Sequence, residues 1–215
     1  MDREKVICLI LIFFNLTGFG QKSVTETVST EDKSAGFVSI YLGTMIPSMI
    51  SSSLGLHPVI GASIGARKGK YSYSITGEGR FADTRQDYTI NNKDQDTLML
   101  TNEFLGALIG FEIGYNVLQK ESWSIDAVAG VGYELVRTIL YPENYTDDVT
   151  INTYNLNIGL SCRKKINATT YLGLTARYNF VDYTLADQSD LIENYFLLTL
   201  HLGYNARRAP TAGFE

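Results

Sequence analysis

Apolar and polar side chains alternate with a period of two over most of the chain from Gly36 onwards. This alternation predicts β-strands with one apolar and one polar face, because successive side chains of a strand point to opposite sides. The stretch ALIGFEIGY, residues 107–115, shows the pattern clearly. Ile109 and Phe111 share one face, so the carboxylate of Glu112 is expected to point away from them rather than to interrupt an apolar helix.

The pattern repeats in eight segments, which predicts an all-β fold, an eight-stranded antiparallel up-and-down transmembrane barrel. The expected strands are 36–45, 57–67, 71–81, 104–117, 123–137, 151–163, 170–181 and 194–205. The connections ARKGK, LQKES and RKKINA are short and basic. Those around DTRQDYTINNKDQDT, YPENYTDD and DYTLADQSDLIE are longer and acidic. Short turns at one end and long loops at the other are typical of outer-membrane barrels.

Alternation alone does not decide which face of the barrel points inward. A soluble lipocalin-like barrel keeps its apolar side chains inside, whereas a membrane barrel turns them outward. Lysine is missing from the interiors of the expected strands, and the polar face is rich in Gly, Ser, Thr and Asn. Small residues suit the crowded interior of a narrow barrel. The sequence therefore favours the membrane barrel and leaves a soluble secreted barrel that binds an apolar ligand as an alternative.

Aromatic residues concentrate towards the two ends of the apolar face, with aliphatic residues between them. Two aromatic rings around an apolar band match the two interfaces of a bilayer. The expected girdle residues are Tyr71, Tyr115, Trp123 and Tyr204 at the short-turn end, and Tyr133, Tyr178, Phe180 and Phe196 towards the long-loop end.

The segments outside the barrel have their own signatures. Residues 1–20 have a weakly basic start, a short apolar run and a small-residue site, which predict a secretory signal peptide. We expect residues 21–35 to form a flexible periplasmic lead-in, 36–205 the barrel and 206–215 a C-terminal tail. After the signal only Cys162 remains, so no intrachain disulfide is expected.

Composition narrows the class further. The chain has 215 residues, 14 of them tyrosine and 19 glycine, and aromatic residues make up 12%. Glycine is a poor helix former, which agrees with a β fold. The net charge of −5 argues against binding to nucleic acid, which requires a basic surface.

These features resemble the small eight-stranded outer-membrane barrels of Gram-negative bacteria, the OmpA-like and OmpX-like group. The resemblance is architectural: it rests on the signal peptide, the eight strands and the alternating turn lengths, and it covers nearly all of the mature chain. It implies a monomeric integral barrel in contact with outer-membrane lipid and lipopolysaccharide. Such proteins commonly end on an aromatic residue in the last strand, whereas this chain continues with ARRAPTAGFE.

With the polar face inward, charged residues of both signs enter the lumen. Four carboxylates balance four guanidiniums, and pairing relieves the cost of burying them. We expect salt bridges to close the lumen, with a narrow selective pore lined by the same charges as the alternative. The expected charge network comprises Arg67, Glu78, Arg80, Glu112, Asp126, Glu134, Arg163 and Arg177.

Little in the sequence points to catalysis. His57 and His201 are expected to face the lumen, and the last two strands offer no outward Ser–His pair that could meet an acyl chain. The acidic runs NNKDQD and PENYTDD lack the glycine and terminal glutamate of a helix–loop–helix calcium site. We therefore expect no enzyme, cofactor or metal. The expected role is envelope structure, surface binding or association with an envelope protein complex through the long loops.

Overall fold

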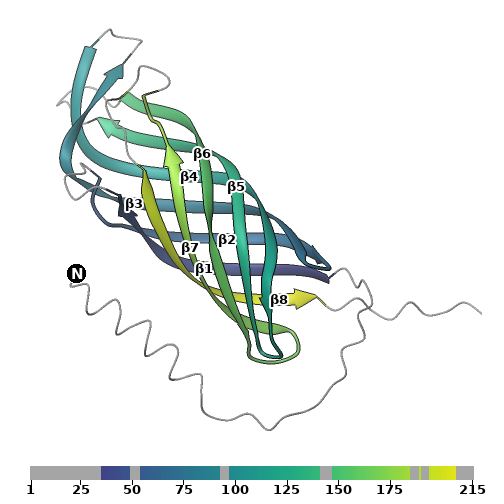
Figure 1. The fold of residues 1–215 in the computed structure, drawn as a ribbon. Helices are drawn as coiled ribbons and strands as arrows, with labels where there is room; N and C mark the ends of the chain where they lie inside the picture. Colours follow the sequence, from purple (N-terminus) through teal and green to yellow (C-terminus); the bar gives the residue numbers. More distant parts are fainter. Residues whose placement is uncertain are drawn as a thin grey trace, which may run out of the picture. The chain divides into compact units, whose positions relative to one another are not determined.

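The computed structural model describes residues 35–48, 54–92, 97–140, 147–184, 189 and 194–206. Within these ranges eight strands close into one antiparallel barrel, in which sequence neighbours pair and β8 pairs with β1 (Figure 1). The predicted eight-stranded up-and-down barrel is confirmed. The strands are β1 (Ala35–Pro47), β2 (His57–Lys68), β3 (Tyr71–Asn92), β4 (Thr97–Gln119), β5 (Trp123–Leu140), β6 (Asp147–Lys165), β7 (Thr170–Val181) and β8 (Tyr195–Ala206).

The segments predicted to flank the barrel fall almost entirely outside the described residues. This applies to the signal peptide, to the lead-in up to residue 34 and to the tail from residue 207. No helix long and apolar enough to cross a bilayer occurs in the part of the chain that the structure describes.

Strands β3 and β4 continue well beyond their expected ends. The sequence predicted a long loop after residue 81, but β3 runs to Asn92 and β4 begins at Thr97. A register shift lies between Asp83 and Tyr88. There the Thr84 hydroxyl lies 3.0 Å from the carbonyl oxygen of Asn102, to which it donates. The loop prediction was wrong because a hairpin beyond the apolar band can carry polar side chains and still pair along its backbone.

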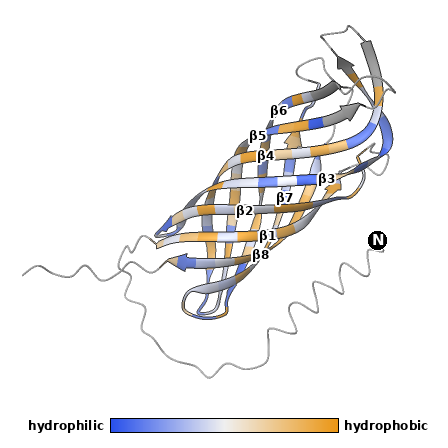
Figure 2. Ribbon diagram, turned by 180° about the vertical axis from the view of Figure 1, so that it is seen from behind, coloured by the Kyte–Doolittle hydropathy of each residue, from blue (hydrophilic) through white to orange (hydrophobic). Residues whose placement is uncertain are grey.

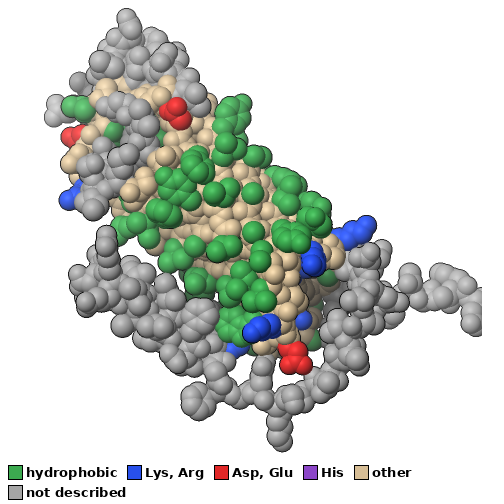
Figure 3. Space-filling model, in the orientation of Figure 1, with side chains coloured by type: hydrophobic (Ala, Val, Ile, Leu, Met, Phe, Trp, Pro, Cys, Tyr) green, Lys and Arg blue, Asp and Glu red, His purple; other side chains and the backbone are tan. Residues whose placement is uncertain are grey.

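The apolar face of the barrel points outward. Ile40, Leu42 and Ile64 are 62%, 64% and 64% exposed, and most large side chains of this face are similarly accessible. Hydrophobic and hydrophilic residues alternate along the strands (Figure 2), and hydrophobic side chains cover the visible barrel wall (Figure 3). A closed barrel with an apolar wall suits a lipid environment, because every strand edge is paired. This wall contradicts the soluble alternative, which would place polar residues outside.

Candidate functional site

The charged side chains inside the barrel form three groups at successive levels along its axis. At the level nearest the short turns, Asp126 on β5 pairs with two arginines. Its Oδ2 lies 2.9 Å from Nη2 of Arg67 and also contacts the Arg163 guanidinium. The amide of Asn116 donates to the other oxygen, Oδ1, at 2.7 Å. Both oxygens of this carboxylate are therefore satisfied, by side chains from β2, β4 and β6.

The central group joins two carboxylates through one guanidinium. Arg177 on β7 donates to Glu78 on β3 and to Glu112 on β4. The hydroxyl of Tyr41 donates to Oε1 of Glu78 at 3.0 Å. Glu112, which the sequence placed opposite the apolar face of its strand, thus reaches an arginine across the lumen.

The third group lies closer to the long loops and is completely enclosed. Arg80 pairs with Glu134 through Nη1, and its Nη2 lies 3.0 Å from Oε2 of Glu78. Because Glu78 contacts both Arg80 and Arg177, it links this group to the central one. The side chains of Arg80 and Glu134 are both 0% exposed. A buried charge needs a full set of partners, since the interior solvates it poorly.

Neighbouring polar groups complete the shell around Glu134. The Tyr183 hydroxyl donates to Oε1 at 2.5 Å, and the Tyr195 hydroxyl donates to Oε2 at 3.2 Å. The amide of Asn155 donates to Oε2 at 3.0 Å. The structure therefore brings all eight charged residues singled out in the sequence into ion pairs, and it adds tyrosine and asparagine partners that alternation alone did not indicate.

The lumen at the long-loop end is apolar, which the alternation along the chain did not predict. A signal was present: alternation gives way to adjacent apolar residues near this end of several strands, as in Phe104-Leu105, Leu135-Val136 and Phe180-Val181. On β5 and β7 the second residue of the pair, Val136 or Val181, faces the lumen, and on β4 the first residue, Phe104, does. We call the resulting cluster the apolar plug, which comprises Met45, Leu54, Val59, Tyr88, Ile90, Phe104, Val136, Ile151, Val181, Tyr183, Tyr195 and Leu197.

A small polar cavity occupies the other half of the lumen, towards the short turns. Its volume is about 60 Å³, and its lining includes Glu112, Asp126 and Arg177 together with several serine and threonine hydroxyls. Since one water needs roughly 10–15 Å³ on this measure, there is room for about four waters. The lumen therefore has a half with a polar cavity large enough for a few waters and an apolar half, with the enclosed charge group between them.

Both histidines face the interior. The His57 ring packs on Phe104 with centroids 4.7 Å apart. Nε2 of His201 lies 2.8 Å from the Thr199 hydroxyl, and its ring lies 4.6 Å from that of Tyr41. Neither side chain lies on the lipid-facing wall, where an acyl chain would have to be cleaved.

The expected girdle residues lie on the outer wall. At the short-turn end the rings of Tyr71 and Tyr115 lie 5.4 Å apart, and Trp123 and Tyr204 lie on the same face. Towards the long loops, Tyr178 packs between Phe180 and Phe196, with centroids 4.8 Å away in each case. Tyr133 packs on Tyr154 at 5.7 Å.

Other candidate sites receive little support. The side chains of the acidic runs NNKDQD and PENYTDD lie outside the described residues. No group of three His, Cys, Asp or Glu side chains that could hold a metal ion occurs within the described ranges.

Comparisons with known proteins agree with the fold. No protein-family model matches the sequence, and a search of curated proteins gave no significant match. Among solved structures, the barrel is similar to Neisserial surface protein A, with a TM-score of 0.57 and 14% identity over 82% of this chain and 100% of that one. It is also similar to the N-terminal β-barrel domain of Pseudomonas aeruginosa OprF, with a TM-score of 0.51 and 11% identity over 80% and 99% of the two chains.

A major outer membrane protein from Thermus thermophilus matches with a TM-score of 0.50 and 12% identity, covering 80% of this chain and 99% of that one. At these identities the likeness concerns the fold. Together with the apolar outer wall, it makes the chain a small barrel of the outer-membrane type.

Proposed function

We propose that this outer-membrane barrel is a non-enzymatic protein with a closed lumen, which acts in envelope structure or in binding at its long-loop end. The observation that carries the proposal is the apolar plug. Water and ions leave narrow apolar constrictions, so such a segment is a barrier to conduction by itself. The salt bridges around Glu78 and Arg177 lie directly beneath it.

If the lumen is closed, partners are expected to bind at the ends of the barrel. The hairpin of β3 and β4 extends past the level at which β2 and β5 pair with it, since the pairing with β2 ends at Arg80 and that with β5 ends at Leu105. Binding surfaces of barrel proteins commonly lie on such extensions, which a rigid scaffold holds in place. We place surface binding, or association with an envelope complex, at this end.

A narrow pore is the second candidate, and the polar cavity favours it. Water in the short-turn half would form part of an ion path if the central charge group and the apolar plug could open. The continuous contacts from Arg177 through Glu78 to Arg80 favour the closed form.

Conductance in planar bilayers separates the two candidates. We expect no steady conductance from the purified, folded protein under conditions in which a general porin conducts. Steady open channels would overturn the closed lumen. Recovery in the outer-membrane fraction, with different gel mobility before and after heating, checks both residence and folding. Lipid hydrolysis that disappears in His201→Ala would contradict the non-enzymatic proposal.

A further inference from the structure

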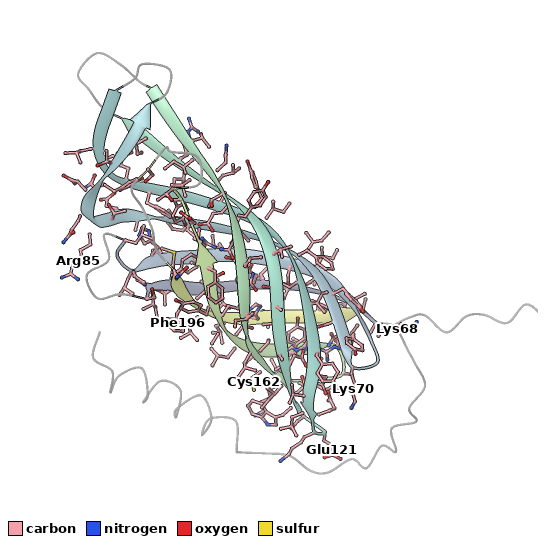
Figure 4. The ribbon with its side chains drawn as sticks, turned by 45° about the horizontal axis from the view of Figure 1, so that its top comes forward. Lys68, Lys70, Arg85, Glu121, Cys162 and Phe196 are labelled. Atoms are coloured by element: carbon pink, nitrogen blue, oxygen red, sulfur yellow. The ribbon has the colours of Figure 1, made fainter. Side chains whose placement is uncertain are left out.

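Basic side chains gather at the short-turn end of the barrel. Lys68 and Lys70 flank the β2–β3 turn, Lys120 follows β4, and Lys164 and Lys165 end β6. We call these five residues the basic collar. Figure 4 shows Lys68, Lys70 and Glu121 at this end and Arg85 at the other. Among the described residues of the three short turns, only Glu121 is acidic.

The turns that carry the basic collar are held by backbone hydrogen bonds. Gly69 adopts a φ of 58°, which allows a tight β2–β3 turn. The amide of Asn116 donates to the carbonyl of Lys70 at 2.7 Å, which ties this turn to β4. The amide of Lys165 donates to the carbonyl of Ser122 at 2.8 Å, which joins the β4–β5 and β6–β7 turns. The lysines therefore extend from a fixed ring of backbone.

The basic collar lies beside the aromatic residues of the same end. The Lys164 ammonium lies 5.2 Å from the centre of the Trp123 ring. Lys68 pairs in register with Tyr71, whose ring packs on Tyr115. Trp and Tyr on a membrane protein mark the depth of the lipid headgroups. Lys68 and Lys164 are thereby placed on the lateral surface at headgroup depth.

The described residues at the opposite end carry no comparable basic cluster. Asp83, Asp87 and Glu103 lie on the extended hairpin with Arg85 among them, and Arg137 lies at the same end on β5. The two ends of the described barrel therefore differ in the sign of their charge, so an anionic ligand would be drawn to the short-turn end.

We propose that the basic collar binds the headgroups of anionic phospholipids in the membrane leaflet at the short-turn end. Lipid is favoured over a polymer or protein beyond the membrane because Lys164 and Lys68 are associated with the lateral aromatic wall rather than with the mouth of the barrel. The proposal does not depend on whether the lumen conducts. Each lysine near an anionic lipid surface raises affinity by about fivefold.

The single tryptophan of the chain provides a local probe, because Trp123 lies in contact with the collar. The full-length protein is reconstituted in phosphatidylcholine vesicles that contain phosphatidylglycerol, with brominated acyl chains on one lipid or the other. We expect brominated phosphatidylglycerol to quench Trp123 fluorescence with a relative affinity about fivefold above that of brominated phosphatidylcholine. The preference is expected to fall at high salt, because salt screens exposed charges.

Variants test which residues cause the preference for phosphatidylglycerol. Lys68→Gln combined with Lys164→Gln is expected to bring the relative affinity close to one, whereas Arg85→Gln at the far end leaves it unchanged. Glu121→Gln, which removes the acidic residue of these turns, is expected to increase it. The ratio of quenching by the two lipids cancels any change in the intrinsic emission of Trp123. Gel mobility before and after heating shows that each variant has folded, and Lys164→Gln alone serves if the double variant does not fold.

Equal quenching by the two lipids in the unmodified protein would overturn the proposal. So would a preference that survives in the double variant. If instead the protein co-sediments with purified cell-wall sacculi through these lysines and shows no lipid preference, the basic collar binds the cell-wall polymer and the lipid assignment is wrong.

Discussion

Glu134 illustrates what a buried carboxylate needs inside this barrel. Its two oxygens are contacted by Arg80, Tyr183, Tyr195 and Asn155, and water does not reach them. Glu112 is less enclosed, since its side chain is 15% exposed and it borders the polar cavity. The two carboxylates were equivalent members of one predicted network, but burial makes their energetic roles different.

This difference leads to a prediction about stability. Glu134→Gln keeps the shape of the side chain but leaves Arg80 with one fewer charged partner in a fully buried site. We expect the free energy of unfolding, measured with urea in lipid vesicles, to fall by about 1–3 kcal/mol, because Arg80 keeps Glu78 but loses its second anionic acceptor in a buried site.

Glu112→Gln is the matched comparison. In both variants the arginine keeps Glu78 as a partner, but the cavity beside Glu112 can supply water, so the loss for Glu112→Gln is expected to be clearly smaller. Equal losses of unfolding free energy in the two variants would show that burial does not determine how much stability is lost when a carboxylate is neutralised here.

At the scale of the elements, β6 and β7 approach each other closely at Gly159. A Cβ atom at this position would lie 2.1 Å from the carbonyl oxygen of Ala176 and 2.8 Å from Cα of Arg177. Both are backbone atoms, so the contact cannot be relieved by rotating a side chain. On β3, by contrast, a Cβ at Gly77 would meet nothing within 4 Å.

Alanine at these two glycines should therefore affect stability differently. We expect Gly159→Ala to destabilise the barrel by about 1–3 kcal/mol, because the strands must move apart. Gly77→Ala is expected to be neutral or slightly stabilising, because it reduces the freedom of the unfolded chain. The temperature at which the compact gel band disappears gives the ranking, and a tolerated Gly159→Ala would contradict the close approach.

On the scale of the whole molecule, two different barriers lie in series along the lumen. The charged barrier is weakened by removing Arg177, which contacts both Glu78 and Glu112 in the central group. The apolar plug would remain, and it excludes ions for a separate reason.

Conductance should consequently appear only when both barriers are weakened. We expect Arg177→Ala to stay closed in planar bilayers, as does Phe104→Ala combined with Leu197→Ala. The triple variant is expected to show measurable channels, provided that its heat-dependent gel mobility confirms folding. Channels in Arg177→Ala alone would mean that the apolar plug is not a barrier.

The sequence by itself determined the strand count, the antiparallel order and the division of side chains between two faces, and it favoured the apolar face as the outer one, which the exposed wall of the structure then decided. These follow from local rules, because a period of two assigns each side chain to a face and turn lengths indicate neighbouring strands. These rules do not predict which charged side chains pair with each other. The pairing of Glu112 with Arg177, and of Arg80 with Glu78 and Glu134, depends on how strands far apart in the chain close into a ring. The apolar plug and the extension of β3 and β4 were likewise decided by tertiary structure. At the long-loop end the inward side chains are apolar because they pack against one another in the mouth of the barrel. Alternation of apolar and polar residues therefore no longer identifies the inward face there.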